Sequence, residues 1–159
     1  MKERALRQLG EIETWVEQRQ LHTQINNNSR RGIITSELLY LSLLEVLEEV
    51  HDKPDILKLA MVYPVPGRVI IEFLKSHDEV KILEELDDEL ERSIKAIAYD
   101  QQISTKITGK NDIYDWIGEY TPDKVRQILR NTWPGLIAEG EETSFFLDDI
   151  PARPSGKRG

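Results

Sequence analysis

The sequence contains no cysteine, and this absence excludes several kinds of chemistry. Without a thiol the chain can form no disulfide, no cysteine-ligated zinc site, no cysteine-held iron–sulfur cluster and no cysteine nucleophile. Its three histidines are His22, His51 and His77, and no two of them stand at the spacing of metal ligands. A metal site built by this chain is therefore not expected.

Long apolar runs and an excess of basic residues are missing as well. No run approaches the roughly 20 apolar residues that cross a bilayer, and the amino terminus reads as a charged helix rather than a signal peptide. The formal net charge is −8, which repels phosphate backbones. We therefore expect a cytoplasmic chain whose partners are neither a membrane nor a nucleic acid.

What the sequence does contain is a regular alternation of strand and helix patterns. Between Asp55 and Gln102, short apolar runs alternate with stretches whose apolar residues recur three or four positions apart. Two strands joined by a crossover helix form a βαβ unit, in which the strands are parallel and helices cover the sheet. At 159 residues the chain has the length of one domain with tails.

The rest of the chain extends this sheet. Strands are predicted at 20–25 (an edge strand), 32–36, 55–60, 80–83 and 104–108. A helix capped by Ser36 is expected after the second strand, and Thr121-Pro122-Asp123 is typical of a helix start. Residues 111–120 are predicted to be an aromatic loop that forms either a lid on the sheet or a partner surface.

Three segments follow from this pattern. Residues 1–19 form an amino-terminal helix, 20–136 the α/β domain, and 137–159 a flexible tail. We expect the helix to dock on the core through its apolar stripe, the alternative being a connector from a preceding domain. In the tail, Phe145-Phe146-Leu147 either docks on the domain or awaits a partner, and the sequence favours neither.

Candidate functional residues gather where strands end. The corner Tyr63-Pro64-Val65-Pro66 is rigid and follows a strand, which is the functional edge of a parallel sheet. Glu84 and Glu85 form a possible acid–base pair, but neighbouring strand residues point to opposite faces. We therefore prefer Glu84 as the partner of a polar group or helix start and Glu85 as a solvated residue. A phosphate site near Ser36 is disfavoured because Glu37 follows it.

Several of these stretches together resemble a known family. They are Gly32-Ile33-Ile34-Thr35-Ser36, Leu57-Lys58-Leu59, Met61-Val62-Tyr63-Pro64-Val65-Pro66, Glu84-Glu85-Leu86-Asp87 and Gly118-Glu119-Tyr120-Thr121-Pro122. In this order they resemble the middle domain of the alpha subunit of indolepyruvate ferredoxin oxidoreductases. These enzymes are members of the thiamine-diphosphate-dependent 2-oxoacid:ferredoxin oxidoreductase family.

The resemblance implies a fold and a place in a larger enzyme. The fold is that of the transketolase carboxyl-terminal domain, a three-layer α/β/α sandwich with a mostly parallel sheet of about five strands and one antiparallel edge strand. The full enzyme oxidatively decarboxylates arylpyruvates, with coenzyme A and ferredoxin as acceptors. Its thiamine diphosphate, Mg²⁺ and iron–sulfur clusters are expected in other domains, so the resemblance places no catalytic or cofactor residue here.

Two departures from the family pattern stand out. Glu37 takes the place of a glycine that usually follows the Thr-Ser pair. The segment Ile150-Pro151-Ala152-Arg153-Pro154 resembles the linker to the thiamine-binding domain, but the chain stops at Gly159. We therefore expect either a piece of the alpha subunit or a stand-alone relative of it.

The leading hypothesis is a non-catalytic structural and interaction domain whose partners are other domains or subunits of such a complex. We expect its interdomain surface near Tyr63, Pro64, Glu84, Gly109 and Tyr120. One alternative is a stand-alone regulatory domain that binds a small ligand, and another is an independent enzyme with Glu84 as base.

Overall fold

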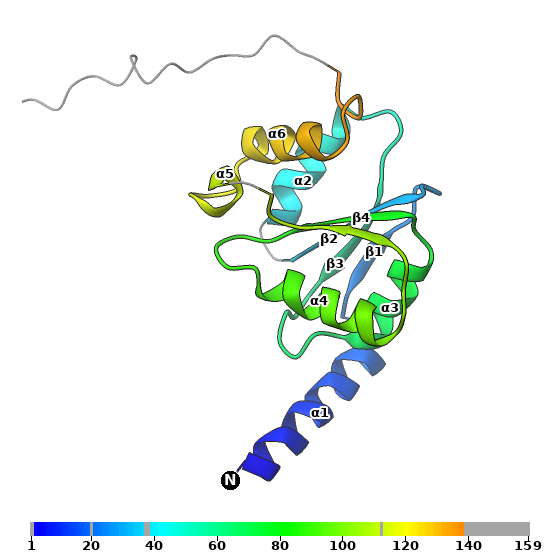
Figure 1. Cartoon of the computed structure of the whole chain (residues 1–159), viewed down its shortest axis with the longest axis vertical. Helices are drawn as coiled ribbons and strands as arrows, with labels where there is room; N and C mark the ends of the chain where they lie inside the picture. Colours follow the sequence, from blue (N-terminus) through cyan, green and yellow to red (C-terminus); the bar gives the residue numbers. More distant parts are fainter. Residues whose placement is uncertain (1, 20, 37–38, 112, 139–159) are drawn as a thin grey trace, which may run out of the picture.

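A computed structural model describes residues 2–19, 21–36, 39–111 and 113–138. In this part of the chain the strands form one sheet in the order β1-β3-β2-β4-β5 (Figure 1). They are β1 (Thr23–Ile25), β2 (Arg31–Ser36), β3 (Asp55–Leu59), β4 (Glu79–Leu83) and β5 (Lys106–Thr108). The four strands from β2 to β5 run parallel, and β1 pairs antiparallel with β3. The predicted sheet with its antiparallel edge strand is confirmed.

Helices cover both faces of this sheet. On one side lie α2 (Leu39–Glu48) and α6 (Pro122–Thr132), and on the other α3 (Gly67–Lys75) and α4 (Glu89–Asp100) (Figure 1). Successive strand residues point to opposite faces. Ile33 of β2 therefore packs in the core that contains α2 and α6, whereas Ile34 packs in the core that contains α3 and α4. The result is the three-layer α/β/α arrangement expected from the sequence.

The helix boundaries follow local chemistry. Thr121 caps α6 by accepting a hydrogen bond from the backbone N–H of Lys124, and Pro122 occupies the first turn. Beyond the end of α6, Gly135 adopts a φ of +86°, a left-handed conformation that glycine takes at little cost. Ile137 is still buried, so the packed body includes this residue.

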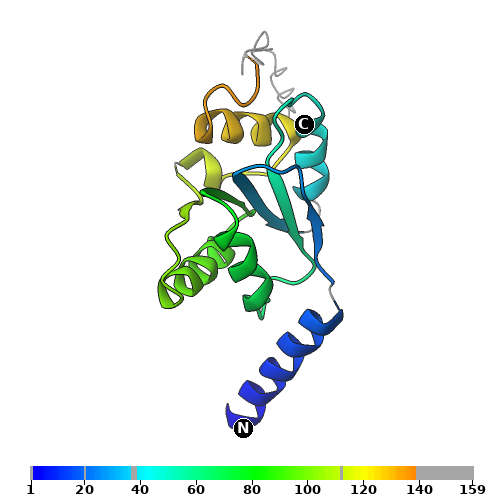
Figure 2. The ribbon, with the colours of Figure 1, turned by 90° about the vertical axis from the view of Figure 1, so that its right-hand side faces the viewer.

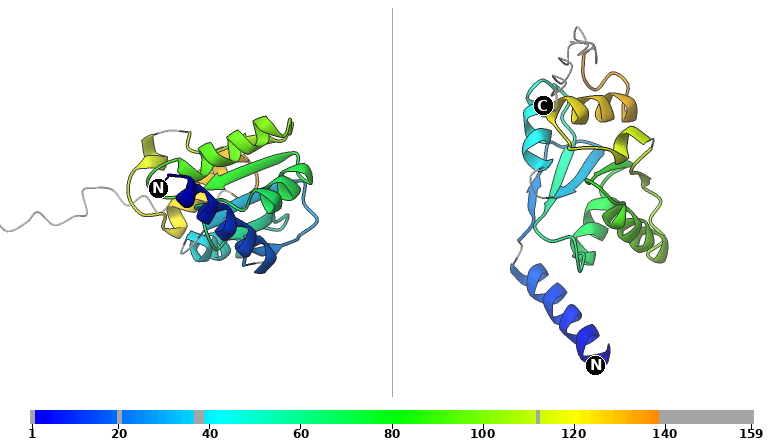
Figure 3. Two further views of the ribbon diagram at one scale, coloured as in Figure 1. Left: turned by 90° about the horizontal axis from the view of Figure 1, so that it is seen from below. Right: turned by 90° about the vertical axis from the view of Figure 1, so that its left-hand side faces the viewer.

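The amino-terminal helix α1 (Lys2–Arg19) extends away from this body (Figures 1, 2 and 3). Leu6, Ile12 and Trp15 remain 60%, 42% and 51% exposed, and Val16 is buried. The expected docking of the whole apolar stripe is therefore wrong. Helical periodicity shows that a face is apolar, but it does not show whether the face is covered by the same fold.

Two further expectations need comment. Residues 111–120 were expected to be a loop, but they contain the short helix α5 (Ile113–Trp116). The cap of α2 and the environment of Glu37 lie outside the described residues, as does the tail from 139 to 159.

Candidate functional site

A hollow of about 540 Å³ opens at the carboxyl ends of β2 and β4, between the loop after β3 and the start of α4. Its apolar lining is formed by Leu39, Val62, Tyr63, Leu86 and Leu90. Its acidic lining is formed by Glu84, Glu85, Asp87 and Glu89, and Ser36 and Ser93 complete it. This is the edge at which parallel sheets usually place their functional residues.

Glu84 serves as the cap of α4. Its carboxylate accepts hydrogen bonds from the backbone N–H groups of Leu90, at 2.9 Å, and Glu91, at 2.8 Å. Asp88 stands at the position before the helix, but its side chain makes no capping bond. Burial raises the pKa of Glu84, although the two N–H donors oppose the shift. The preferred interpretation, that Glu84 meets a helix start, is confirmed.

Glu85 has a different partner. Its side chain is exposed, yet Oε1 accepts a hydrogen bond of 2.8 Å from the backbone N–H of Tyr120. This bond ties the end of β4 to the residue just before the cap of α6, so Glu85 is not merely solvated as expected. Because Glu84 and Glu85 bind different backbone groups, the geometry gives no support to a shared acid–base site.

Gly109 lies inside the fold and is packed against Glu91 of α4. A Cβ atom at position 109 would stand 1.8 Å from the carboxylate carbon of Glu91. That carboxylate accepts a 2.9 Å hydrogen bond from the backbone N–H of Lys110, and the carbonyl of Gly109 accepts one from Nζ of Lys81. Gly109 therefore presents no side chain to a partner.

Tyr120 is also buried, with 4% of its surface exposed. Its hydroxyl donates a 2.8 Å hydrogen bond to the carbonyl of Asp115. Nζ of Lys124 lies 4.3 Å from the centre of its ring, and Nζ of Lys110 lies 5.1 Å from it. Burial lowers the pKa of both lysines. These contacts tie the α5 region to the sheet, while Ile113 and Ile117 remain 74% and 63% exposed.

The predicted surface residues thus separate into two groups. Tyr63 and Glu84 line the hollow, with Tyr63 71% exposed and joined to Pro64 by a cis peptide bond. Gly109 and Tyr120 lie in the interior beside it. The partner surface expected from the sequence therefore remains a prediction that rests on the rim of the hollow rather than on all five residues.

Comparison with known proteins connects this fold to an enzyme subunit. The chain is 34% identical over 132 residues to the indolepyruvate oxidoreductase subunit IorA of Pyrococcus horikoshii. The aligned residues make up 80% of this chain and 20% of that protein. It is 32% identical over 130 residues to the IorA subunit of Methanothermobacter thermautotrophicus, with the same coverage. The chain resembles one segment of IorA. The family resemblance expected from the motifs is therefore confirmed.

The resemblance to IorA also extends over nearly the whole chain. The IorA subunit of Methanothermobacter marburgensis matches over 158 residues, or 97% of this chain, at 25% identity. In each case the chain spans only about a fifth to a quarter of the length of the relative. No protein-family model matches the chain.

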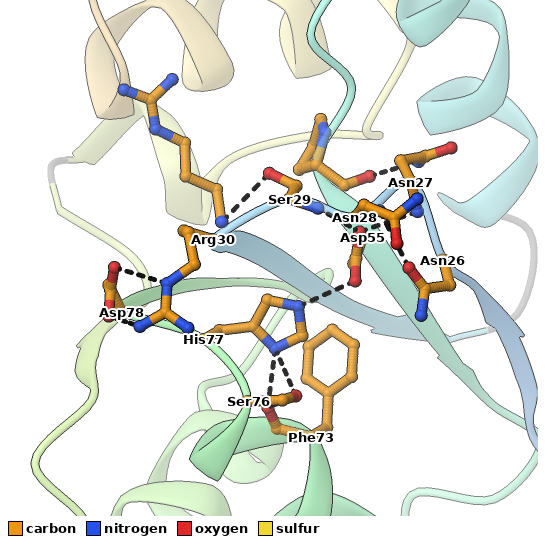
Figure 4. A network of polar contacts seen from close by, with 12 residues as sticks. Asn26, Asn27, Asn28, Ser29, Arg30, Asp55, Phe73, Ser76, His77 and Asp78 are labelled. Atoms are coloured by element: carbon orange, nitrogen blue, oxygen red, sulfur yellow. Dashed lines mark hydrogen bonds and ion pairs between the residues drawn. The ribbon is translucent and has the colours of Figure 1, made fainter.

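A second polar network, at the amino ends of the strands, was not anticipated from the sequence (Figure 4). Asp55 and His77 are both buried, and Nε2 of His77 lies 3.1 Å from Oδ2 of Asp55. Oδ1 of Asp55 accepts hydrogen bonds from the backbone N–H groups of Asn27, at 2.8 Å, and Ser29, at 3.0 Å. Nδ1 of His77 lies 2.7 Å from the carbonyl of Phe73. The network joins the β1–β2 turn to the end of α3.

Two negative findings apply to the described residues alone. Within residues 2–138, apart from the gaps at 20, 37–38 and 112, no three histidine, cysteine, aspartate or glutamate side chains stand close enough to hold a metal ion. No helix in the same ranges has the length and apolar content to cross a membrane.

Proposed function

We propose that the chain acts as a non-catalytic interaction domain of an indolepyruvate oxidoreductase subunit of the IorA type. The observation that carries this proposal is the hydrogen bonding of the two glutamates at the carboxyl edge of the sheet. Glu84 and Glu85 are each bonded to backbone N–H groups that hold the fold together. The same edge exposes apolar side chains, as a docking surface does.

In the proposed enzyme this domain contributes packing, subunit contact and correct placement of the neighbouring domains. The enzyme would oxidatively decarboxylate arylpyruvates, pass the acyl group to coenzyme A and the electrons to ferredoxin, and work in the cytoplasm. Thiamine diphosphate, Mg²⁺ and iron–sulfur clusters would be bound by its other parts. The absence of cysteine supports this division, because thiolates are the usual ligands of such clusters.

A turnover assay tests the non-catalytic role. The purified chain would be incubated with indolepyruvate, thiamine diphosphate, Mg²⁺, coenzyme A and an artificial electron acceptor. A complete IorA-containing enzyme serves as the positive control. We expect no turnover above the protein-free background, and turnover that scales with the concentration of the chain would contradict the proposal.

The size of the hollow favours one alternative, a small-ligand-binding regulatory domain. At about 540 Å³ it falls within the roughly 300–1,000 Å³ of small-molecule sites. A ligand that binds only the folded state raises the melting temperature in a saturable way. Thermal melts with nucleotides, thiamine diphosphate and 2-oxoacids distinguish the two functions, since the interaction domain predicts no shift with any of them.

A further inference from the structure

The hollow at the carboxyl edge has an apolar floor and an apolar lip. Leu39 and Leu90 are buried at its base, whereas Val62 and Tyr63 are 39% and 71% exposed at its rim. The lip belongs to a corner stiffened by Pro64 and Pro66, so it needs little ordering before a partner binds. An exposed apolar rim on a rigid corner is suited to contact with another polypeptide.

Leu86, which also lines the hollow, supports the same conclusion. It adopts a φ of 58°, a left-handed conformation that costs a residue with a side chain about 1–2 kcal/mol. Its side chain is nevertheless 75% exposed. Such strained positions tend to occur at functional sites. Covering Leu86 with a partner would recover apolar contact that the isolated domain does not make.

Further apolar side chains are exposed on the α5 region, which is bonded to the end of β4. Two hydrogen bonds hold the α5 region beside the acidic lining of the hollow, which we call the acidic wall. One runs from the N–H of Tyr120 to Glu85, and the other from Nζ of Lys110 to the carbonyl of Glu84. Ile113 and Ile117 are exposed there. Together with the exposed side chains at the hollow, they offer apolar contacts to a polypeptide segment.

The negative charge of the hollow indicates the charge of the segment that binds there. Its lining includes four carboxylates and no lysine or arginine among the described residues. Two cations that contact its lining are already engaged, since Arg92 pairs with Asp88 and Glu89, and Lys110 donates to the carbonyl of Glu84. An anionic ligand would be repelled, whereas an arginine or lysine would be attracted and would complement the wall.

We propose that this hollow receives an arginine or lysine side chain from a polypeptide segment whose neighbouring residues are apolar and cover Tyr63 and Leu86. This inference rests on the proposed function and deepens it by naming the chemistry of the docking partner. In the enzyme the segment belongs to another domain or subunit. The cation lies against the acidic wall, and the apolar neighbours pack on the two exposed side chains.

The probe for this proposal is the peptide acetyl-Trp-Leu-Arg-Leu-amide. A matched peptide with citrulline in place of arginine has nearly the same shape without the charge. Binding to the ¹⁵N-labelled chain is followed through the backbone amide shifts of Ser36, Leu86 and Ser93. We expect saturable shifts with the arginine peptide, an apparent Kd at least tenfold weaker with the citrulline peptide, and weaker binding as salt is added.

A charge-neutralised variant tests whether the arginine peptide binds at the acidic wall. Combining Glu85→Gln, Asp87→Asn and Glu89→Gln removes three charges from the wall, while Glu84 stays intact because it caps α4. The glutamine at position 85 retains an oxygen for the N–H of Tyr120. We expect at least a tenfold loss of affinity for the arginine peptide and an unchanged amide spectrum away from the hollow.

The control variant changes the net charge equally but elsewhere, by Glu45→Gln, Glu48→Gln and Asp100→Asn. We expect it to bind the arginine peptide as the wild type does. Equal binding of the citrulline peptide, no shifts at the hollow, or equal affinity in the two variants would each overturn the inference.

A separate experiment tests the proposed function. This chain replaces the matching segment of an IorA subunit, and the assembly of that subunit is measured. If the charge-neutralised variant assembles in that subunit as well as the wild type does, the proposal that the hollow binds a cationic side chain is wrong, and the proposed function as an interaction domain is retained. If the arginine peptide binds but the wild-type chain does not assemble in the subunit, the cation site in the hollow is supported and the proposed function is contradicted.

Discussion

Replacing Gly109 by alanine tests the packing that holds the carboxyl edge together. The new Cβ would stand 1.8 Å from both Cδ and Oε2 of Glu91, far inside van der Waals contact. Glu91 is only 7% exposed, so its carboxylate has little room to move. Its displacement would break the 2.9 Å hydrogen bond from the backbone N–H of Lys110 and disturb the ion pair with Lys95.

The magnitude follows from these contacts. A part-buried N–H left without a partner costs roughly 1–3 kcal/mol. Alanine also restricts the unfolded chain, which returns about 0.4–1 kcal/mol. We therefore expect the free energy of unfolding to fall by about 1–2 kcal/mol, which lowers the melting temperature by roughly 2–8 °C for a chain of this size.

Urea unfolding and thermal melts measure this change, and two further variants make it specific. In a Glu91→Ala background the clash is absent, so Gly109→Ala should then cost less than about 0.5 kcal/mol. Gly10→Ala is the matched control, because a Cβ there has no neighbouring heavy atom within 4 Å, and alanine favours the helix. Stability unchanged within about 0.5 kcal/mol in Gly109→Ala would refute this account of the packing.

Three other predictions concern the polar contacts. Asp55→Ala should lower the free energy of unfolding by about 3 kcal/mol or more, because it leaves two backbone N–H groups and His77 without their partner; urea unfolding at the wild-type value would contradict this. Thr121→Ala should cost about 1 kcal/mol through loss of the α6 cap, whereas Thr121→Ser should cost clearly less. Folding raises the pKa of Glu84 above its ordinary value of 4.5, so its contribution to stability is fully present below that value and declines as the pH rises through the folded-state pKa. Glu84→Gln does not ionise, and its stability relative to wild type should therefore increase from pH 4 to pH 7 in a series of urea titrations; a relative decrease would show that the sign is wrong.

The sheet was predictable because its signals are local. Ile33 and Ile34 stand in a short run that is buried on both faces, which is the pattern of a parallel strand under two helix layers. Thr121 and Pro122 mark the start of α6 by chemistry within one turn. The family resemblance supplied the antiparallel direction of the edge strand, which periodicity alone does not give.

The contacts that shape the candidate site depend on pairings between distant positions. Gly109 meets Glu91 eighteen positions earlier, and Asp55 meets His77 across helix α3. Neither pair has a sequence signature, so Gly109 is predicted at a surface and the Asp55 network is not predicted at all. The Glu84 cap is an intermediate case, because a carboxylate a few residues before a helix is a recognisable signal even though Asp87 and Asp88 compete for the role.

The apolar stripe of α1 shows the limit of periodicity in another way. Leu6, Ile12 and Trp15 have the spacing of a buried face, yet they remain exposed beyond the body of the domain. Such a stripe predicts that something covers the helix without saying whether the cover is the same fold or another polypeptide.

The central claim, that this chain is an interaction domain of an IorA-type subunit, is tested most directly by segment replacement. The matching 132-residue segment of Pyrococcus horikoshii IorA would be exchanged for this chain, and assembly of the hybrid subunit would be measured by size-exclusion chromatography with light scattering. We predict that the hybrid forms the same complex as the unaltered subunit. Assembly no better than that of a subunit from which the segment has been deleted would contradict the claim.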